Sequence, residues 1–208
     1  MTAKKVGYLA GAGDGVASAL VEMGCTVTQL SGADLVAEKL KGFDAIVTGV
    51  RAFNVRTDLS ASTADALAAF AEQGGTVVIQ YNRPDGLKSK LAPYRLQLST
   101  LRITDRMSPM TFLHPEHPAL SKPNQITKAD FDGWVQERGT YFASEWDEHF
   151  TPLLASSDAG EPELKGGLLV AGYGRGYFVY AGLTFFRQLP AGVPGAYRLF
   201  ANLGSLGR

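Results

Sequence analysis

The chain is poor in the residues that carry most thiol and metal chemistry. It has 208 residues, of which one is a cysteine, Cys25, and three are histidines. A single thiol excludes an internal disulfide and a thiolate metal cluster, since both need at least two cysteines. His114 and His117 lie in a proline-broken segment without the helical i, i+4 geometry that aims two imidazoles at one ion. We therefore expect no metal site, and the redox compartment stays open.

The chain also lacks an excess of charge and a long apolar run. Twenty Lys and Arg residues balance twenty Asp and Glu residues, so the formal charge is zero. Nucleic acid and anionic membranes both attract basic surfaces, and we expect neither as the main partner. No apolar run approaches the roughly 20 residues that cross a bilayer. Residues 1–5 lead straight into a strand pattern, so we expect no signal peptide here, and the compartment stays unknown.

The first eighty residues alternate between strand and helix patterns. Hydrophobic residues make up 45% of the chain, which is enough to bury a sizeable core. Alternation at this spacing indicates right-handed crossovers and a parallel sheet, so the fold class expected is α/β, a flavodoxin-like three-layer sandwich with a mostly parallel sheet. Strands are predicted at residues 6–10, 26–30, 44–50 and 76–81, and helices at 16–23, 34–40 and 60–73.

The pattern changes after Asn82. Residues 83–125 are rich in proline and show no clear helical period, so we expect loops and short edge strands. Two apolar runs flank GYGRG at 172–176 and predict an added C-terminal β-hairpin. Residues 194–203 are predicted to form a helix. Because there is no repeat and no linker, we interpret residues 1–208 as a single domain with a loop-rich elaboration at 83–150.

Ligands in an open parallel sheet bind at the carboxyl ends of the strands, where the loops converge. The loops that follow the first, third and fourth predicted strands carry polar side chains to this edge. This inference from the fold makes ligand-binding candidates of Asp14, Arg51, Asn54, Tyr81 and Asn82.

The glycine loop at 11–15 invites comparison with a dinucleotide-binding fingerprint. The third glycine of that fingerprint is replaced by Val16. Asp14 would repel a phosphate, whereas it suits a helix N-terminus. A tight turn with a capping aspartate is the favoured interpretation, and we expect no cofactor.

Long segments of the chain resemble known families. The runs DAIVTGVRAFN at 44–54 and GTVVIQYN at 75–82 resemble class I glutamine amidotransferase-like domains. FDGWVQERG at 131–139 and FFRQLPAGVPGAYRLF at 185–200 resemble the C-terminal region of bacterial PIG-L (LmbE-like) deacetylase polypeptides more closely. The resemblance implies a partner, a zinc-dependent de-N-acetylase domain in the same polypeptide. The zinc motif of that deacetylase has no counterpart in this chain.

The amidotransferase resemblance implies a cysteine nucleophile on a sharp turn after a strand, with a histidine base and a glutamate. We expect that turn after the fourth strand, at Tyr81 and Asn82, where there is no cysteine. Cys25 precedes the second strand, at the opposite edge, and is interpreted as structural. The His114-Pro115-Glu116 run looks like the family's histidine and glutamate pair. However, about ninety residues follow it, and a surface turn is favoured. We therefore predict no catalytic residues.

A segment near residue 140 combines carboxylates with aromatic side chains, which is typical of sugar-binding sites. The competing interpretation has Arg138 in an ion pair with Glu137 or Glu145, and tryptophans that seal the core. We expect Arg187, after the hairpin, to join the same surface. The further binding candidates are Asp132, Trp134, Glu137, Arg138, Glu145 and Arg187.

Three hypotheses remain open at this point. The first is a non-catalytic accessory domain that supports a sugar-processing deacetylase by packing, oligomerisation or glycan binding. The second is a hydrolase of carbohydrate-type substrates that uses Asp132, Glu137 or Glu145 as acid and base. The third is a purely structural homo-oligomer with a large apolar interface. A deacetylase domain, a glycan and a second copy of the chain are the partner hypotheses.

Overall fold

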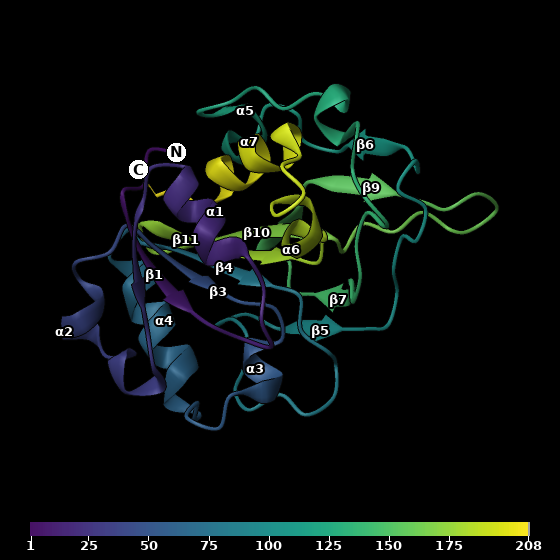
Figure 1. The fold of residues 1–208 in the computed structure, drawn as a ribbon. Helices are drawn as coiled ribbons and strands as arrows, with labels where there is room; N and C mark the ends of the chain where they lie inside the picture. The colour runs from purple at the N-terminus through teal and green to yellow at the C-terminus, as the bar shows by residue number, and fades with distance from the viewer. Residues whose placement is uncertain (208) are drawn as a thin grey trace.

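A computed structural model describes residues 1–207 and is built around a seven-stranded sheet, in the order β2-β1-β3-β4-β11-β10-β8 (Figure 1). The first five of these strands run parallel, and β10 and β8 are antiparallel additions at one edge. The mostly parallel sheet that the sequence predicts is therefore confirmed. The strands are β1 (Lys5–Leu9), β2 (Thr26–Gln29), β3 (Ala45–Thr48), β4 (Thr76–Gln80), β8 (Phe150–Pro152), β10 (Leu168–Tyr173) and β11 (Gly176–Ala181).

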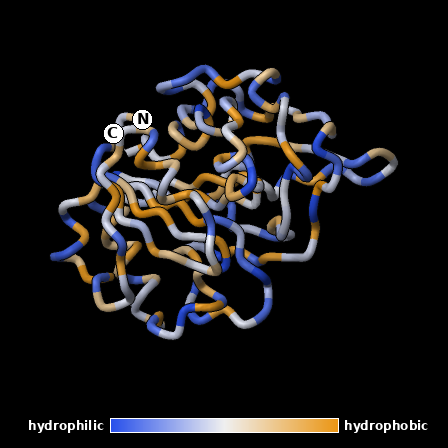
Figure 2. The backbone as a smooth tube through the Cα atoms, viewed as in Figure 1, coloured by the Kyte–Doolittle hydropathy of each residue, from blue (hydrophilic) through white to orange (hydrophobic). Residues whose placement is uncertain are grey.

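Helices cover both faces of this sheet, which gives the three layers of a flavodoxin-like sandwich (Figure 1). Every residue of β3 and β4 is buried, as expected for parallel strands covered on both sides. The tube coloured by hydropathy shows these central strands as the apolar middle of the molecule (Figure 2). One face carries α1 (Val16–Glu22) and α7 (Pro194–Leu203), and the other carries α2 (Ala37–Leu40) and α4 (Ser62–Glu72).

The predicted C-terminal hairpin is present, and its second strand enters the main sheet. Gly174 has a φ of 58° at the turn between β10 and β11, a conformation that glycine adopts without strain. β11 then pairs in parallel with β4, with Tyr177 opposite Thr76. This pairing places the chain after β11 beside the chain after β4, at the carboxyl edge of the sheet.

Two predictions about helices were wrong. The helix expected at 34–40 is split into a 3₁₀ turn, η1 (Gly32–Asp34), and the short α2, because Val36 is extended between them. No helix was expected in 83–125, yet α5 (Pro118–Ser121) forms there. Pro118 occupies its first turn, and the ring of His117 accepts a hydrogen bond from the Ala119 amide at 3.1 Å.

Residues 83–150, which the sequence analysis interprets as an elaboration, contribute to the main core. Ile103, Met110 and Phe131 are buried in the same apolar cluster as α1 and α7. No helix in residues 1–207 is long and apolar enough to cross a bilayer. The remaining elements are α3 (Ala52–Val55), β5 (Leu96–Leu98), β6 (Met110–Phe112), η2 (Lys128–Phe131), β7 (Ala143–Trp146), β9 (Leu154–Ser156) and α6 (Phe185–Gln188), with β5 paired to β7 and β6 paired to β9.

Candidate ligand site at the carboxyl edge of the sheet

The sharp strand-to-helix turn at this edge follows β3. Arg51 has a φ of 58° and a ψ of 20°, and α3 begins at the next residue. The backbone N–H of Arg51 donates to the Tyr81 carbonyl at 2.8 Å, which ties this turn to the end of β4. The sequence predicts a sharp turn after β4, where the next element is a strand, β5 (Leu96–Leu98), and no helix follows directly. An arginine, and no cysteine, occupies the sharp turn after β3.

Cys25 lies at the opposite edge of the sheet, one residue before β2. It is buried, and its Sγ is 3.4 Å from the carbonyl oxygen of Ala3. Burial raises the pKa of the thiol, whereas a nucleophilic cysteine needs a lowered pKa. The structural role expected for Cys25 agrees with this environment.

Asp14 uses its carboxylate to hold three backbone segments together. It accepts hydrogen bonds from the Tyr8 hydroxyl, from the Val16 amide at 3.0 Å and from the Val50 amide at 2.9 Å. Burial and the adjacent carboxylate raise the pKa of Tyr8 far above its usual range. Asp14 therefore links β1, α1 and the turn after β3. Both of its carboxylate oxygens already accept hydrogen bonds from the protein.

Asn54 and Asn82 are likewise occupied by protein partners. The Asn54 amide donates to the carbonyls of Arg83 and Asp85, and its oxygen accepts from the Arg83 amide at 2.9 Å. Asn82 is 0% exposed and bridges the Phe53 amide and the Gln80 carbonyl. Both asparagines fix the loop after β4 against α3 and leave little for a ligand to contact.

Tyr81 is different, because it belongs to a partly exposed group of rings. It stacks on Tyr141 with ring centroids 5.5 Å apart and an interplanar angle of 13°, and it meets Phe186 at 5.2 Å. The three side chains are neither fully buried nor fully exposed. We call Tyr81, Tyr141 and Phe186 the aromatic platform.

Charged side chains surround the aromatic platform. The guanidinium of Arg187 lies 4.7 Å from the Phe186 centroid, and that of Arg102 lies 6.0 Å from the Tyr141 centroid. Arg187 is also paired with Glu137, Nε to Oε1 at 3.0 Å. Burial raises the pKa of Tyr81, and the positive charges of Arg51 and Arg187 oppose that shift.

Buried polar groups beneath the platform hold it in place. The hydroxyl of Tyr180 in β11 donates to the Tyr141 carbonyl. Gln188 is fully buried and exchanges hydrogen bonds with both backbone groups of Val135, and Thr184 donates to the Glu137 carbonyl at 2.7 Å. Sequence reasoning missed these supports because their partners are up to 53 positions away.

The charged aromatic segment does not form one surface. Trp134 is 1% exposed and packs on Phe131 and Phe185, so it is a core residue. Arg138 is also buried, and it donates to the carbonyls of Ser108 and Phe131. Burial lowers its pKa from the ordinary value. Neither side chain is placed to bind a ligand, and the ion pairs expected for Arg138 were wrong.

The three candidate carboxylates of this segment also lie in different surroundings. Glu145, in β7, pairs with Arg95, whereas Glu137 pairs with Arg187 at the platform. Asp132 is exposed just after η2. Of the three candidate carboxylates in this segment, Glu137 is the one that is paired with a neighbour of the aromatic platform, Arg187.

His114, Glu116 and His117, which the sequence offers as possible catalytic or metal-binding residues, have surface and capping positions in the structure. His114 and Glu116 lie at the surface turn that the sequence favoured, and His117 caps α5. Burial lowers the pKa of His117. Residues 1–207 contain no cluster of three or more His, Cys, Asp or Glu side chains that could hold a metal ion.

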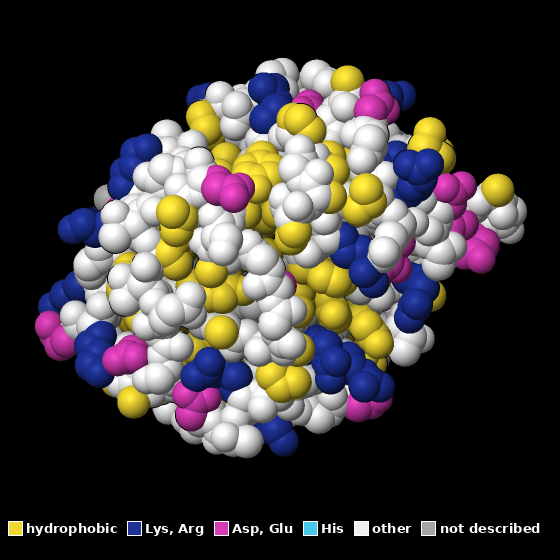
Figure 3. Space-filling view, in the orientation of Figure 1, with side chains coloured by type: hydrophobic (Ala, Val, Ile, Leu, Met, Phe, Trp, Pro, Cys, Tyr) yellow, Lys and Arg dark blue, Asp and Glu magenta, His cyan; other side chains and the backbone are white. Residues whose placement is uncertain are grey.

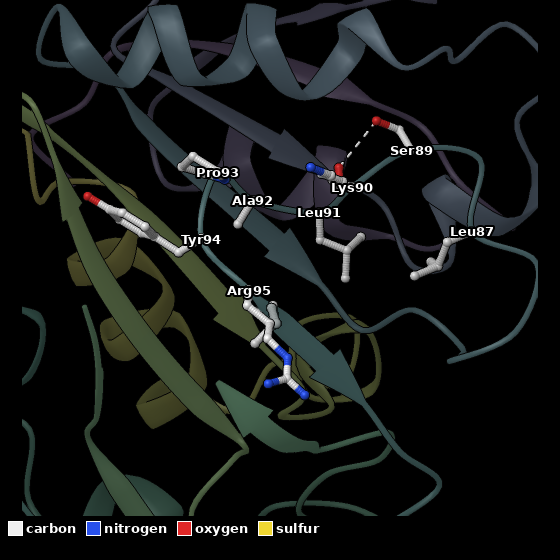
Figure 4. Close-up of a pocket in the computed structure, with 9 residues that line it drawn as sticks. Leu87, Ser89, Lys90, Leu91, Ala92, Pro93, Tyr94 and Arg95 are labelled. Carbon is white, nitrogen blue, oxygen red and sulfur yellow. Dashed lines mark hydrogen bonds between the residues drawn. The ribbon is translucent and has the colours of Figure 1, made fainter. Parts of the chain in front are cut away.

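A separate groove of about 580 Å³ lies along residues 87–96 (Figure 4). Leu87, Leu91 and Pro93 make much of its wall, and the side chains of Lys90 and Arg95 are its charged groups. One continuous segment forms all of the lining, so the groove does not draw on the strand ends. Figure 3 shows apolar side chains open to solvent in the middle of the face seen in Figure 1, with Lys and Arg groups nearby.

Comparison with known proteins gives similarity in fold. No family model matches the chain, and no curated protein matches it in sequence. A cytoplasmic protein of Salmonella typhimurium, STM3548, superposes with a TM-score of 0.59 at 11% identity, over 97% of this chain and 98% of that one. A putative ThuA-like protein of Bacteroides uniformis gives 0.55 at 14% identity, over 96% and 89%. A β-galactosidase of Rahnella sp. R3 gives 0.57 at 16% identity, over 96% of this chain and 30% of the enzyme. The chain therefore shares its α/β fold with these proteins.

Proposed function

We propose that this chain is a non-catalytic glutamine amidotransferase-like domain that binds a glycan at the aromatic platform. It would serve as an accessory to a sugar-processing enzyme, a PIG-L family de-N-acetylase in the first instance. One observation carries the proposal: the sharp turn after β3 has Arg51 where a nucleophile would stand, and the backbone N–H of Arg51 is bonded at 2.8 Å to the carbonyl of Tyr81, whose ring is half-exposed and stacked on Tyr141.

Half-exposed rings at a ligand edge suit sugar binding. The C–H faces of a pyranose pack on aromatic rings, while its hydroxyls bond to nearby charged groups. Glu137 and Arg187, paired at 3.0 Å beside Phe186, supply an acceptor and a donor for hydroxyls. The rings and the ion pair together offer both kinds of contact within one small area.

The structural neighbours support an accessory role. The superposition on the Rahnella β-galactosidase includes 96% of this chain but only 30% of the enzyme. A fold of this kind therefore occurs there as one part of a larger sugar-acting enzyme. The link to a PIG-L deacetylase rests on the resemblance of residues 131–139 and 185–200. Oligomerisation stays a prediction beside glycan binding.

The hydrolase alternative receives no comparable support. Acid and base carboxylates in glycosidases stand about 5 to 10 Å apart and face one bond. Here Glu137 and Glu145 pair with different arginines on different elements, Arg187 in α6 and Arg95 before β5. Asp132 is exposed after η2 and, among the described residues, shares neither of these ion pairs.

Isothermal titration with N-acetylated and de-N-acetylated chito-oligosaccharides tests the proposal. We expect Tyr81→Ala to abolish the binding heat, whereas Tyr94→Ala should leave it unchanged. Tyr94 is a matched control because it is also half-buried and stacked, on His149 at 4.1 Å, but lines the groove at 87–96. Circular dichroism checks that both variants fold. No heat with any oligosaccharide, or loss of heat only in Tyr94→Ala, would overturn the proposal.

A further inference from the structure

Positive charge at the aromatic platform is not balanced by the protein itself. Among residues 1–207, neither Arg51 nor Arg102 forms an ion pair, and Glu137 is engaged by Arg187. Two guanidinium groups at this edge therefore lack an acidic partner. An anionic ligand at this edge would balance the charge that each of these guanidinium groups carries.

Arg51 also carries an unsatisfied polar atom. Its Nε is buried and has no hydrogen-bond partner. A buried donor that is left unpaired destabilises the folded state, so such groups in a native protein call for an explanation. The backbone of Arg51 is fixed through its bond to the Tyr81 carbonyl, which leaves the guanidinium as the part that can meet a ligand.

Backbone strain is concentrated at the same place. Three non-glycine residues in 1–207 have positive φ: Arg51 at 58°, Gln136 at 60° and Tyr141 at 52°. Arg51 and Tyr141 belong to the site, and Gln136 precedes Glu137. Such conformations are unfavourable and persist mainly where the surroundings enforce them, often at ligand sites. Tyr180 and Gln188 supply that enforcement here.

We infer that the ligand of this site is an acidic sugar, with its ring on the aromatic platform and its carboxylate held by Arg51 and Arg102. This inference rests on the proposed glycan binding and narrows the ligand to a chemical class. A carboxylate accepts two parallel N–H bonds from a guanidinium, which suits a planar arginine better than a neutral hydroxyl does. Arg102 is exposed beside Tyr141, so it can reach a bound ligand without rearrangement of the core.

Two ligands that differ only in charge test the inference. Trigalacturonate carries free carboxylates, and its fully methyl-esterified form has the same skeleton without charge. We expect the acid to bind the full chain at least about tenfold more tightly than the ester at low salt, with a difference that shrinks as salt is added. Arg102→Gln should weaken binding of the acid by about tenfold and leave binding of the ester unchanged. Arg106→Gln is the matched control, because Arg106 is an exposed arginine of the same loop whose guanidinium, within residues 1–207, lies over none of the platform rings.

The outcomes separate the inference from the proposed function. Equal affinity for acid and ester, with both lost in Tyr81→Ala, overturns the acidic ligand and leaves glycan binding standing. Binding of the acid that is equally weakened by Arg102→Gln and Arg106→Gln also overturns it, because general surface charge would then explain the preference. No binding of either form, while chito-oligosaccharides bind at Tyr81, contradicts the inference alone. No binding of any sugar contradicts both.

Discussion

The hydroxyl of Tyr180, buried in β11, donates a hydrogen bond to the backbone carbonyl of Tyr141, whose ring is stacked on Tyr81. Burial raises the pKa of Tyr180 far above its usual range, so the hydroxyl keeps its proton and remains a donor. The contact joins the core of the sheet to a residue with left-handed backbone geometry. The position of the platform therefore depends on a side chain that no ligand would touch.

Tyr180→Phe should lower the free energy of unfolding by about 1–3 kcal/mol, because the Tyr141 carbonyl loses its donor in a buried setting. Chemical denaturation measures this change. Tyr177→Phe is the control in the same strand, since no side-chain hydrogen bond of Tyr177 is present in residues 1–207. Equal stability of the two variants would contradict the support assigned to Tyr180.

Asp14→Ala should destabilise the fold by about 2–4 kcal/mol. The change leaves the Tyr8 hydroxyl and the amides of Val16 and Val50 without their acceptor. Thermal or urea unfolding gives the value, and Glu161→Ala, an exposed loop carboxylate, serves as the control. If Asp14→Ala were as stable as the control and lost only sugar binding, Asp14 would be a residue that contacts the ligand and would not be the structural link between these segments.

Asp158 should make stability depend on acid pH. Burial alone would raise the pKa of Asp158, but hydrogen bonds from Ser108, from Thr104 and from the Asp105 amide outweigh it and hold the pKa at about 2. A carboxyl group whose folded pKa is lowered stabilises the protein above its unfolded pKa of about 3.9. That contribution is lost as the pH falls from about 4 towards 2.

Denaturation at a series of pH values tests this account. Asp158→Asn should flatten the loss of stability over that interval, whereas Asp65→Asn, at an exposed position in α4, should keep the wild-type profile. Parallel profiles for wild type and Asp158→Asn would show that the carboxylate of Asp158 is not responsible. The result bears on the site because Ser108 also accepts a hydrogen bond from the buried Arg138.

Cys25 should react slowly with iodoacetamide in the folded protein. Its thiol is buried and has a raised pKa, so little thiolate is present at mildly alkaline pH. We expect alkylation to be on the order of tenfold or more faster after unfolding in denaturant, as followed by mass spectrometry. A native rate that matches or exceeds the unfolded rate would point to an activated thiol and to catalysis.

Local patterns predicted much of the fold. The helix expected at 194–203 coincides with α7, because Pro194 starts it and its apolar residues recur at helical spacing. The four parallel strands of the first half were also found. The buried β1, β3 and β4 are short apolar runs, and β2 is an exposed edge strand rich in β-branched residues. The split at Val36 escaped prediction, because the backbone there is set by the capping of η1 by Ser31 and Asp34.

The site was harder to predict because it depends on long-range pairing. Tyr81 meets Phe186 only because β11 lies beside β4, and Tyr141 joins them only because Tyr180 holds its carbonyl. Sequence reasoning nominated Tyr81, Glu137, Arg51 and Arg187, and Tyr141 lies in the segment of carboxylates and aromatic side chains that it proposed for sugar binding. It did not nominate Arg102 or Phe186. Composition alone also could not tell that Trp134 faces the core.

Chemical-shift mapping of the full chain tests the central claim most directly. The ¹⁵N-labelled protein is titrated with a chito-oligosaccharide, and then with trigalacturonate. We predict that the largest shifts fall on the backbone amides of residues 51, 81, 141 and 186, four positions far apart in sequence that converge at one edge of the sheet. Shifts confined to residues 87–96, or none at all with either sugar, would contradict a glycan site on the aromatic platform.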